Sequence, residues 1–346
     1  MARERIISGA HVDGDNDPVV NTLRPTTLGE LVGQKPVIDQ LCIALEAASE
    51  RAEPLEHVLL DGPPGLGKTT LAHIIAREMN AQIRVTSGPA VVKQGDLMST
   101  LTNMETGDVL FIDEIHRLNK PVEEFLYPAM EDFRVDFTIE GGLSGRTVNF
   151  SLKRFTLIGA TTRAGLLSSA LRDRFGLRFH FDFYDVEDLT EIVRRSAARL
   201  EIPCEPGALS MIARRARGTP RVANRLLRRT RDFAQVRADG KLDTGTVDRA
   251  LDILQIDQLG LDELDRQYLR TLIVTYNGGP AGVEALAASL GQERDTLEDV
   301  VEPYLLQIGF VTRTRQGRCA TAAACDHLHL PLPTAANEPR SEKSLF

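Results

Sequence analysis

The sequence predicts an α/β core, followed by a small all-helical domain and a C-terminal winged-helix domain. Three short apolar runs, HVLLDG at 57, DVLFIDE at 108 and FTLIGATT at 155, alternate with helical stretches in the first half. Such runs are typical of parallel strands buried on both faces. From about residue 185 only helical patterns follow, and the chain then shows three helices and a hairpin, which is the outline of a winged helix.

The domain boundaries follow these changes of pattern. Helices are expected at 36–51 and 69–80 in the core, and at 263–276, 283–290 and 294–308 in the third domain. The predicted segments are a flexible arm at 1–22, a large α/β domain at 23–184, a small helical domain at 185–256, a winged helix at 257–335 and a disordered tail at 336–346.

Composition excludes several classes of protein. The 346 residues carry a formal net charge of −8, so any contact with nucleic acid must be local rather than a matter of bulk charge. No apolar run approaches the roughly 20 residues that cross a bilayer, and the start has no signal-peptide pattern. We therefore expect a cytoplasmic protein without a membrane contact.

The four cysteines do not form a disulfide framework, and a reducing compartment fits them best. Near the end of the chain Cys319, Cys325, His327 and His329 lie close in sequence and are all potential zinc ligands. Their spacing is poor for a structural zinc site, which favours ordinary packing.

A P-loop follows the first apolar run. The pattern G-x-x-x-x-G-K-T is met by Gly62, Gly67, Lys68 and Thr69, between an apolar strand and an amphipathic helix. Backbone N–H groups of such a loop wrap phosphate, and the following helix adds the positive end of its dipole. We expect Lys68 to reach the outer phosphates of ATP and Thr69 to bind Mg²⁺. The predicted nucleotide contacts in the loop are Gly65, Leu66, Gly67, Lys68, Thr69 and Thr70.

Catalytic groups are expected where two later strands end. Asp113 and Glu114 close an apolar run, and carboxylates at the tip of a buried strand are costly unless they are used. Asp113 suits the Mg²⁺ shell, and Glu114 suits polarisation of the attacking water. In FTLIGATTR the hydroxyl of Thr161 or Thr162 is expected to hold that water or sense the γ-phosphate, with Thr162 as the candidate.

Two arginine motifs allow more than one interpretation. In LRDRFG, Arg172 and Arg174 flank Asp173, which fits surface ion pairs and also fits a finger that acts in a neighbouring subunit's site. The pattern alone does not decide between them. Arg221 follows Gly218, Thr219 and Pro220 at a predicted helix start, from which it could point back to the nucleotide.

These motifs stand in the order P-loop, DEIH, GATT, RDRFG and GTPR, which resembles AAA+ ATPases. The longer strings LRPTTLGELVGQ, LYPAMEDF and ARRARGTPRVANRLLRR resemble the RuvB family of bacterial Holliday-junction branch-migration motors. The resemblance runs from about Leu23 to about residue 320. It implies an α/β P-loop AAA+ core and an ATP-driven translocase of Holliday-junction and duplex DNA, acting in recombination, repair and the SOS response.

The resemblance also implies individual roles. Arg174 would be the finger supplied in trans, and Arg221 would be a sensor in the helical domain. Further nucleotide contacts would come from Leu23, Arg24, Glu131, Asp132, Phe133 and Tyr184. DNA contacts would come from Arg294, Arg313 and Arg318. The implied partners are RuvA, RuvC indirectly, and further copies of the chain in a hexameric ring.

Some strings depart from the family pattern. Ala170 stands where the family usually has Pro, and IEGGLSGRT differs from the usual hairpin tip that docks RuvA. The resemblance therefore supports the ATPase site more firmly than the RuvA contact. After Arg318, CATAAACDHLHL replaces the family's usual end, so nothing is carried over to it.

The third predicted helix of the winged domain is acidic, with Glu293, Asp295, Glu298, Asp299 and Glu302. We therefore expect the hairpin that bears Arg313, Arg315 and Arg318 to meet the DNA backbone in place of this helix. A clamp-loader-like switch and a protein-remodelling AAA+ ATPase remain alternatives, because both would share the first two domains. Stimulation of ATP hydrolysis by four-way junction DNA separates them from a junction motor.

Overall fold

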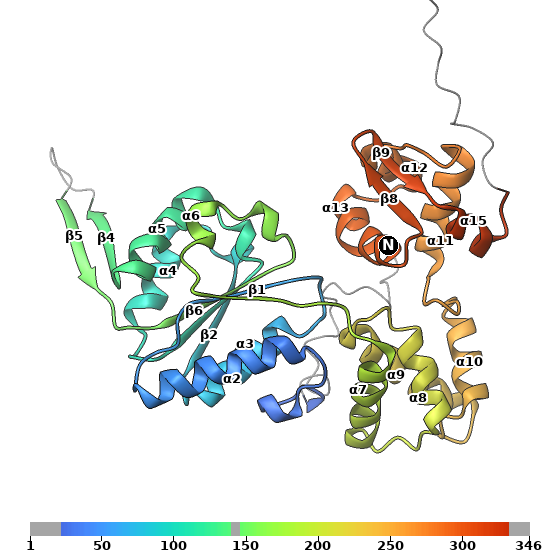
Figure 1. Ribbon diagram of the computed structural model, residues 1–346, viewed down its shortest axis with the longest axis horizontal. Coiled ribbons are helices and arrows are strands. Elements are labelled where there is room, and N and C mark those ends of the chain that lie inside the picture. Colours follow the sequence, from blue (N-terminus) through green and yellow to red (C-terminus); the bar gives the residue numbers. More distant parts are fainter. Residues whose placement is uncertain (1–21, 140–145, 332–346) are drawn as a thin grey trace, which may run out of the picture. The chain divides into compact units, whose positions relative to one another are not determined.

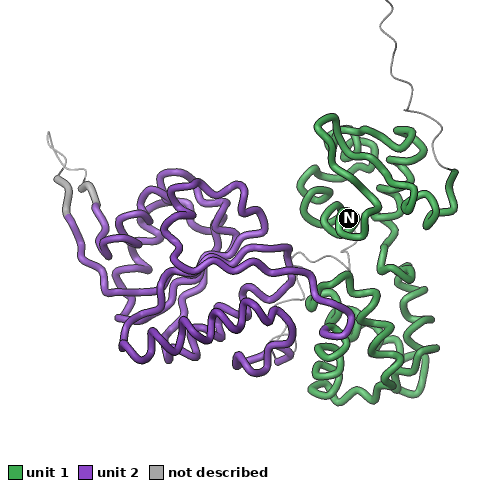
Figure 2. Tube along the Cα trace, in the orientation of Figure 1, with its two compact units in different colours: residues 1–13, 189–346 green, residues 14–188 purple. Residues whose placement is uncertain are grey.

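The computed structural model describes residues 22–139 and 146–331. The chain forms two compact units, divided between Asp188 and Leu189 (Figure 2). In chain order, the described residues up to Asp188 are called the first unit (purple, unit 2 in Figure 2), and those from Leu189 are called the second unit (green, unit 1 in Figure 2). Most of the predicted N-terminal arm, the tip of the 139–147 segment and the predicted C-terminal tail lie outside the described residues. Within the described residues, no helix combines the length and apolar character needed to cross a bilayer.

A five-stranded parallel sheet forms the centre of the first unit. Its strand order is β2-β3-β6-β1-β7. The strands are β1 (Val58–Asp61), β2 (Ile83–Ser87), β3 (Val109–Asp113), β6 (Thr156–Thr161) and β7 (Leu177–His180). The three apolar runs seen in the sequence are the three inner strands, which confirms the predicted α/β core.

Helices cover both faces of this sheet (Figure 1). They are α2 (Lys35–Glu50), α3 (Lys68–Glu78), α4 (Gln94–Thr102), α5 (Lys120–Glu131) and α6 (Ser169–Arg172). Alternate residues of one strand serve opposite faces: Leu60 packs in the cluster with α2 and α3, and Leu59 packs in the cluster with α4 and α5. Because both faces are buried, the inner strands read as continuous apolar runs.

An antiparallel hairpin of β4 (Arg134–Ile139) and β5 (Arg146–Ser151) stands apart from the central sheet (Figure 1). It pairs Arg134 with Ser151 and Ile139 with Arg146. Val135 is fully buried in the cluster with α4 and α5, which fixes the base of the hairpin.

Four helices open the second half: α7 (Val186–Arg199), α8 (Pro206–Arg214), α9 (Pro220–Arg237) and α10 (Thr244–Ile253). The boundary between the two units falls within α7. Asp243 caps α10, because its side chain accepts a hydrogen bond from the backbone N–H of Thr246 at 2.7 Å. The helical character predicted for this part of the chain is confirmed.

The last domain is a winged helix. Its helices are α11 (Glu263–Arg270), which continues through Thr271–Thr275, then α12 (Val283–Leu290), then α13 (Arg294–Thr296), which continues through Leu297–Val301 into α14 (Glu302–Gln307). The hairpin of β8 (Val311–Thr314) and β9 (Gly317–Ala320) follows. The sequence did not predict the helix α15 (Ala322–Leu328), which buries Cys325 in the domain core.

A buried ion pair joins the helical domain to the winged helix within the second unit. The guanidinium of Arg217 contacts the carboxylate of Asp265, and both side chains are almost fully buried. Arg217 Nε also donates to the backbone carbonyl of Gly260 at 2.7 Å, and its guanidinium carbon lies 5.0 Å from the ring centroid of Tyr304. A buried charge is tolerated only with this degree of pairing.

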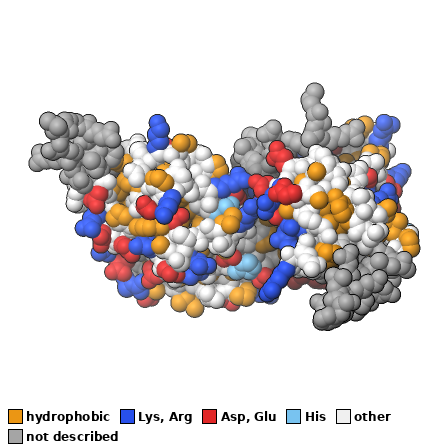
Figure 3. Space-filling model, turned by 90° about the horizontal axis from the view of Figure 1, so that it is seen from above, with side chains coloured by type: hydrophobic (Ala, Val, Ile, Leu, Met, Phe, Trp, Pro, Cys, Tyr) orange, Lys and Arg blue, Asp and Glu red, His pale blue; other side chains and the backbone are white. Residues whose placement is uncertain are grey.

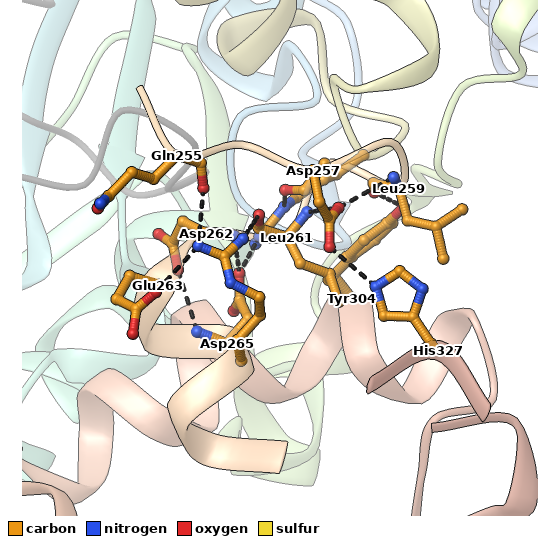
Figure 4. A network of polar contacts seen from close by, with 12 residues as sticks. Gln255, Asp257, Leu259, Leu261, Asp262, Glu263, Asp265, Tyr304 and His327 are labelled. Atoms are coloured by element: carbon orange, nitrogen blue, oxygen red, sulfur yellow. Dashed lines mark hydrogen bonds and ion pairs between the residues drawn. The ribbon is translucent and has the colours of Figure 1, made fainter. Parts of the chain in front are cut away.

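Polar contacts around this junction link segments far apart in sequence (Figure 4). The Tyr304 hydroxyl donates to the Leu259 carbonyl at 2.7 Å, and His327 Nε2 lies 2.8 Å from an oxygen of Asp257. His327 therefore belongs to the junction, while Cys325 belongs to the apolar core. No three His, Cys, Asp or Glu residues within 22–139 and 146–331 group as metal ligands.

The buried side chain of His57, just before β1, joins β6 to α5 through hydrogen bonds. His57 Nδ1 accepts a hydrogen bond from the Leu157 backbone N–H at 2.9 Å, so Nε2 carries the proton and donates to the Met130 carbonyl at 3.1 Å. Its ring lies 5.6 Å from that of Phe155, centroid to centroid. Burial lowers the pKa of His57 below its ordinary value of 6.5.

This lowered pKa predicts a loss of stability in acid. Below pH 6.5 the unfolded chain protonates His57 while the folded protein keeps it neutral, so the free energy of unfolding falls as the pH falls. We expect His57→Gln to be less stable at pH 7.5 and to show a shallower pH dependence between pH 6.5 and 5, by at most about 1.4 kcal/mol per pH unit. Urea unfolding followed by circular dichroism measures both. The exposed His329→Gln is the control, and equal slopes for wild type and His57→Gln would contradict the prediction.

Candidate nucleotide-binding site

Three functional segments meet at one edge of the central sheet. The P-loop follows β1, Asp113 ends β3, and Thr161 ends β6. Strand β6 lies between β1 and β3, and all three run parallel. Their carboxyl ends therefore lie side by side, which is where open α/β sheets bind ligands.

The P-loop backbone takes conformations that favour glycine. Gly62, Gly65 and Gly67 have φ angles of 134°, 80° and 105°. At Gly62 a Cβ atom would lie 2.5 Å from the Phe181 carbonyl oxygen, so a side chain there would displace the neighbouring strand. Helix α3 begins directly after Gly67, which directs its free N–H groups into the loop.

Lys68 is held inside this loop. Its side-chain ammonium donates to the carbonyl oxygens of Gly62 at 2.7 Å and Pro63 at 2.8 Å, and the residue is only 7% exposed. A buried ammonium needs such acceptors. The loop thus presents a concentrated positive charge together with backbone donors, as an anion-binding site requires.

Thr69 and Asp113, the two residues expected to bind Mg²⁺, lie close together. The Thr69 hydroxyl lies 3.5 Å from Asp113 Oδ2, while Asp113 Oδ1 accepts the backbone N–H of Glu114 at 2.9 Å. Hydroxyl and carboxylate oxygens are the ligands that Mg²⁺ prefers, with water in its remaining positions. These two residues therefore fit a Mg²⁺ ion beside the P-loop.

A histidine that the sequence did not single out links Glu114 to β6. His116 Nε2 lies 3.4 Å from Glu114 Oε2, and His116 Nδ1 lies 2.8 Å from the Thr161 hydroxyl. The Thr161 oxygen also accepts the Arg163 backbone N–H at 3.0 Å. Because a carboxylate can only accept, the tautomer with the proton on Nε2 suits Glu114, and Nδ1 then accepts from the Thr161 hydroxyl. The DEIH string held this signal, because its histidine follows the acidic pair by two residues.

The two threonines at the end of β6 differ in their surroundings. Thr161 is fully buried and occupied by His116 and Arg163. Thr162 comes one residue beyond the strand and is half-buried. These contacts give Thr161 a supporting role. Thr162 is less buried and remains the candidate for holding the attacking water.

An apolar depression lies beside the P-loop. It is lined by Leu31, Val32, Gln34, Val37, Ile38, Leu66, Gly67, Leu71, Phe181 and Tyr184. The Tyr184 hydroxyl donates to the Leu66 carbonyl at 3.2 Å, and burial raises the pKa of Tyr184 far above its usual value. Of the nucleotide contacts predicted from the sequence, Leu66, Gly67 and Tyr184 are thus brought together here, and Gln34 is a lining residue that the sequence did not indicate.

Other predicted nucleotide contacts lie elsewhere in the described structure. Leu23 is buried. Arg24 lies near His73 in α3: burial is the main cause that lowers the pKa of His73, and the charge of Arg24 lowers it further. Asp132 pairs with Arg134 at 3.0 Å, and the Phe133 ring packs on Phe155 with centroids 5.9 Å apart. These residues do not line the depression. Arg221 occupies the first turn of α9 in the second unit.

Glu131 and Arg174 are neighbours. Arg174 Nη2 lies 3.0 Å from Glu131 Oε1, and the Arg174 guanidinium covers the ring of Tyr127. Arg172, the alternative finger, ends α6. The structure therefore places two residues that the sequence assigned to the nucleotide site in one cluster on the first unit.

Three family models match successive parts of the chain. The family model described as Holliday junction DNA helicase RuvB P-loop domain matches residues 23–181, the RuvB AAA lid domain matches 184–257, and the RuvB C-terminal winged helix domain matches 258–329. The chain belongs to the RuvB family. It is therefore an ATPase of the DNA-translocating class, as its motifs predicted.

Solved RuvB structures are similar over most of the chain. The Thermotoga maritima RuvB Holliday junction branch migration motor is 54% identical, with a TM-score of 0.82, and the match covers 90% of this chain and 99% of that one. A lysine-to-arginine variant of Thermotoga maritima RuvB is also 54% identical, with a TM-score of 0.84 and coverage of 90% and 100%. An arginine-to-alanine variant has a TM-score of 0.82 with 54% identity, covering 90% of this chain and 99% of that one.

In the RuvB winged helix, the three predicted DNA-contacting arginines are all paired with acids. Arg313 contacts Glu302, and Arg318 contacts both Glu302 and Glu298. Arg294 contacts Glu284 and Glu298. Glu302 is fully buried, so the acidic third helix faces the hairpin arginines, and Arg318 is only 14% exposed. Arg313 and Arg294 are about half exposed.

Lys68 and Glu114 take different places at the P-loop edge, so we expect their substitutions to affect ATP binding and ATP hydrolysis separately. We expect Lys68→Ala to weaken ATP binding at least tenfold, because it removes the charge inside the loop. Glu114→Gln should keep ATP binding and lower phosphate release by about 10² to 10⁴, because an amide cannot take a proton from water. Nucleotide titration and phosphate-release assays measure the two effects. Glu124→Gln on the exposed side of α5 is the matched control. Normal turnover in Glu114→Gln would remove Glu114 from the mechanism.

Proposed function

We propose that this chain is an ATP-driven motor that translocates duplex DNA and drives branch migration of Holliday junctions in recombination and repair. The observation that carries the proposal is that Lys68, Thr69, Asp113 and Glu114 meet at one sheet edge, in a chain that ends in a RuvB winged helix. The Thermotoga relative, a Holliday junction branch migration motor, supports the choice of substrate.

Binding of ATP is assigned to the P-loop and the depression beside it. The triphosphate lies along the backbone of Gly65, Leu66 and Gly67, with Lys68 on the outer phosphates and Thr70 in the first turn of α3. Thr69 and Asp113 would hold a Mg²⁺ ion, which would supply positive charge to neutralise the charge that develops on the phosphates. The base is assigned to the apolar depression lined by Tyr184. Leu23, Arg24 and Arg221 do not line it and keep the nucleotide-site roles that the family resemblance implies.

Hydrolysis is assigned to Glu114 as general base. Its carboxylate accepts the proton of the attacking water, and His116 Nε2, which lies 3.4 Å from Glu114 Oε2, helps to orient that carboxylate. Glu114 has a left-handed backbone, with φ of 51°, which turns its side chain off the line of β3. Thr162 is proposed to hold the same water through its hydroxyl.

Arg174 completes the site of the neighbouring subunit, together with Glu131, Asp132 and Phe133. A guanidinium there stabilises the charge that develops on the transferred phosphoryl group. This role requires a ring, which we propose is a hexamer. The finger therefore couples hydrolysis to assembly.

DNA is held by Arg294, Arg313 and Arg318 through its backbone. On the face seen in Figure 3, basic and acidic side chains stand side by side, which fits local contacts better than a continuous basic surface. Backbone contacts carry no sequence information, as a motor that moves along any sequence requires.

The partners proposed are RuvA, which recognises the junction, and RuvC indirectly, in the cytoplasm. The β4–β5 hairpin is the proposed RuvA contact, although its tip at 140–145 lies outside the described residues. Its sequence differs from the usual tip, so RuvA dependence is a direct test of this contact.

A mixing experiment tests the finger. Arg174→Ala and Lys68→Ala proteins should each be inactive, by about 10³ to 10⁵ for the finger. Mixed rings should recover hydrolysis, because some interfaces then join an intact P-loop to an intact Arg174. Arg178→Ala, which loses a surface ion pair with Asp173 and a 3.4 Å hydrogen bond to the Phe175 carbonyl, is the control and should hydrolyse ATP normally. Mixed oligomers without any recovery would exclude action in trans.

A salt titration tests the DNA contact. If Arg313 binds a phosphate, Arg313→Ala should weaken junction binding for all sequences and flatten the slope of log K against log salt by about one unit. Stimulation of ATP hydrolysis by four-way junction DNA should fall as well, while hydrolysis without DNA is unchanged. Arg249→Ala, at an exposed position of α10, is the control. Both arginines pair with buried Glu302, and Arg313 is tested first because its side chain is 47% exposed whereas that of Arg318 is only 14% exposed. Junction affinity and slope that match wild type would favour a protein-remodelling ATPase.

A further inference from the structure

Arg174 rests on the side chain of Tyr127. Its guanidinium carbon lies 4.2 Å from the centroid of the Tyr127 ring. Nη1 donates to the Ala170 carbonyl at 2.6 Å, and Nη2 contacts Glu131 at 3.0 Å. The guanidinium is therefore supported from below by an aromatic face and at its rim by two oxygens. Only 21% of the Arg174 side chain is exposed.

We propose that Tyr127 is a positioning residue for the arginine finger: its ring face holds the Arg174 guanidinium in the orientation that serves the neighbouring subunit. This inference rests on the proposed role of Arg174 in trans. Tyr127 acts through Arg174 and does not touch the reacting atoms. An aromatic face attracts a guanidinium through its quadrupole and leaves the positive charge in place.

The ring itself is held in place by a second set of contacts. The Tyr127 hydroxyl donates to Glu123 Oε1 at 2.5 Å and lies 3.3 Å from the Ser168 hydroxyl. The Ser168 hydroxyl also contacts Glu123, and its oxygen caps α6 by accepting the Leu171 N–H at 3.1 Å. One carboxylate on α5 thus fixes both the platform and the start of the helix that leads to Arg174.

The two supports of the guanidinium differ in kind. The Glu131 carboxylate is 55% exposed, and an ion pair with so much solvent contributes little. A phosphate that binds Arg174 through Nη2 can displace this carboxylate, because both are acceptors for that donor. The Tyr127 face does not compete for hydrogen bonds. It can stay in contact while the rim partner changes, so it is the support that persists during catalysis.

One departure from the family pattern does not disturb this arrangement. Ala170, where RuvB proteins usually have Pro, supplies a backbone carbonyl to Arg174, and Pro has the same carbonyl. Residue 170 lies in the first turn of α6, where the backbone N–H has no partner within the helix. Alanine therefore preserves the support of the finger.

The test replaces the ring and keeps the volume. Tyr127→Met should lower kcat for ATP about 3- to 30-fold with unchanged nucleotide affinity, because the electrostatic support of the guanidinium is lost. Tyr127→Phe keeps the face and should stay within about 3-fold of wild type. Circular dichroism and nucleotide titration check the fold, and Tyr127→Leu replaces Tyr127→Met if that variant is unfolded. A loss as large in Tyr127→Phe as in Tyr127→Met would overturn the proposal.

Two further measurements separate positioning from a general structural role. In an Arg174→Ala background, Tyr127→Met should have no additional effect on kcat, and additive losses would overturn the proposal. Tyr127→Met mixed with Lys68→Ala should gain hydrolysis as Arg174→Ala mixed with Lys68→Ala does. Recovery with Arg174→Ala alone would overturn the role of Tyr127 and keep the finger. Recovery with neither, in mixed oligomers shown to form, would overturn both.

Discussion

The parallel arrangement of five short strands is the constraint on which the site depends. Parallel strands end at the same edge, so the P-loop, Asp113 and Thr161 become neighbours although up to a hundred residues separate them. The apolar cores on both faces fix the strands, and they thereby fix the distance between Thr69 and Asp113. The catalytic geometry is thus a consequence of core packing, and a cavity beneath β3 would displace Asp113 as surely as a change of loop sequence.

Much of this fold was predictable because its signals are local. The inner strands are fully apolar, and the P-loop combines required glycines with a lysine at fixed spacing. Strands β2 and β7 were not predicted, because each lies at a sheet edge and carries partly exposed polar residues. Helix α15 was not predicted because it is only seven residues long. A helix this short is stabilised mainly by tertiary packing, here by the burial of Cys325 in the domain core. Individual roles in the site came from the family resemblance, and contacts such as Tyr127 with Ser168 needed the tertiary structure.

The winged helix shows how a sequence argument about charge changes once the pairing is known. The acidic third helix and the basic hairpin read as separate features, and only the fold joins them through buried Glu302. Arginines held by carboxylates keep their direction but lose much of their net field. If a DNA phosphate binds these arginines, as we propose, it meets oriented donors with a modest attraction. Such a contact can form and release readily.

The Arg217–Asp265 pair has a consequence for the evolution and engineering of these proteins. Its two members belong to different domains, one from the helical domain and one from the winged helix. Losing either partner alone leaves a buried charge, a change that costs about 3–5 kcal/mol, whereas replacing both together by apolar side chains can be neutral. Exchange of winged helices between RuvB relatives should therefore succeed only where both residues travel as a matched set. The Arg217–Asp265 pair thus limits which helical domains and winged helices can be combined.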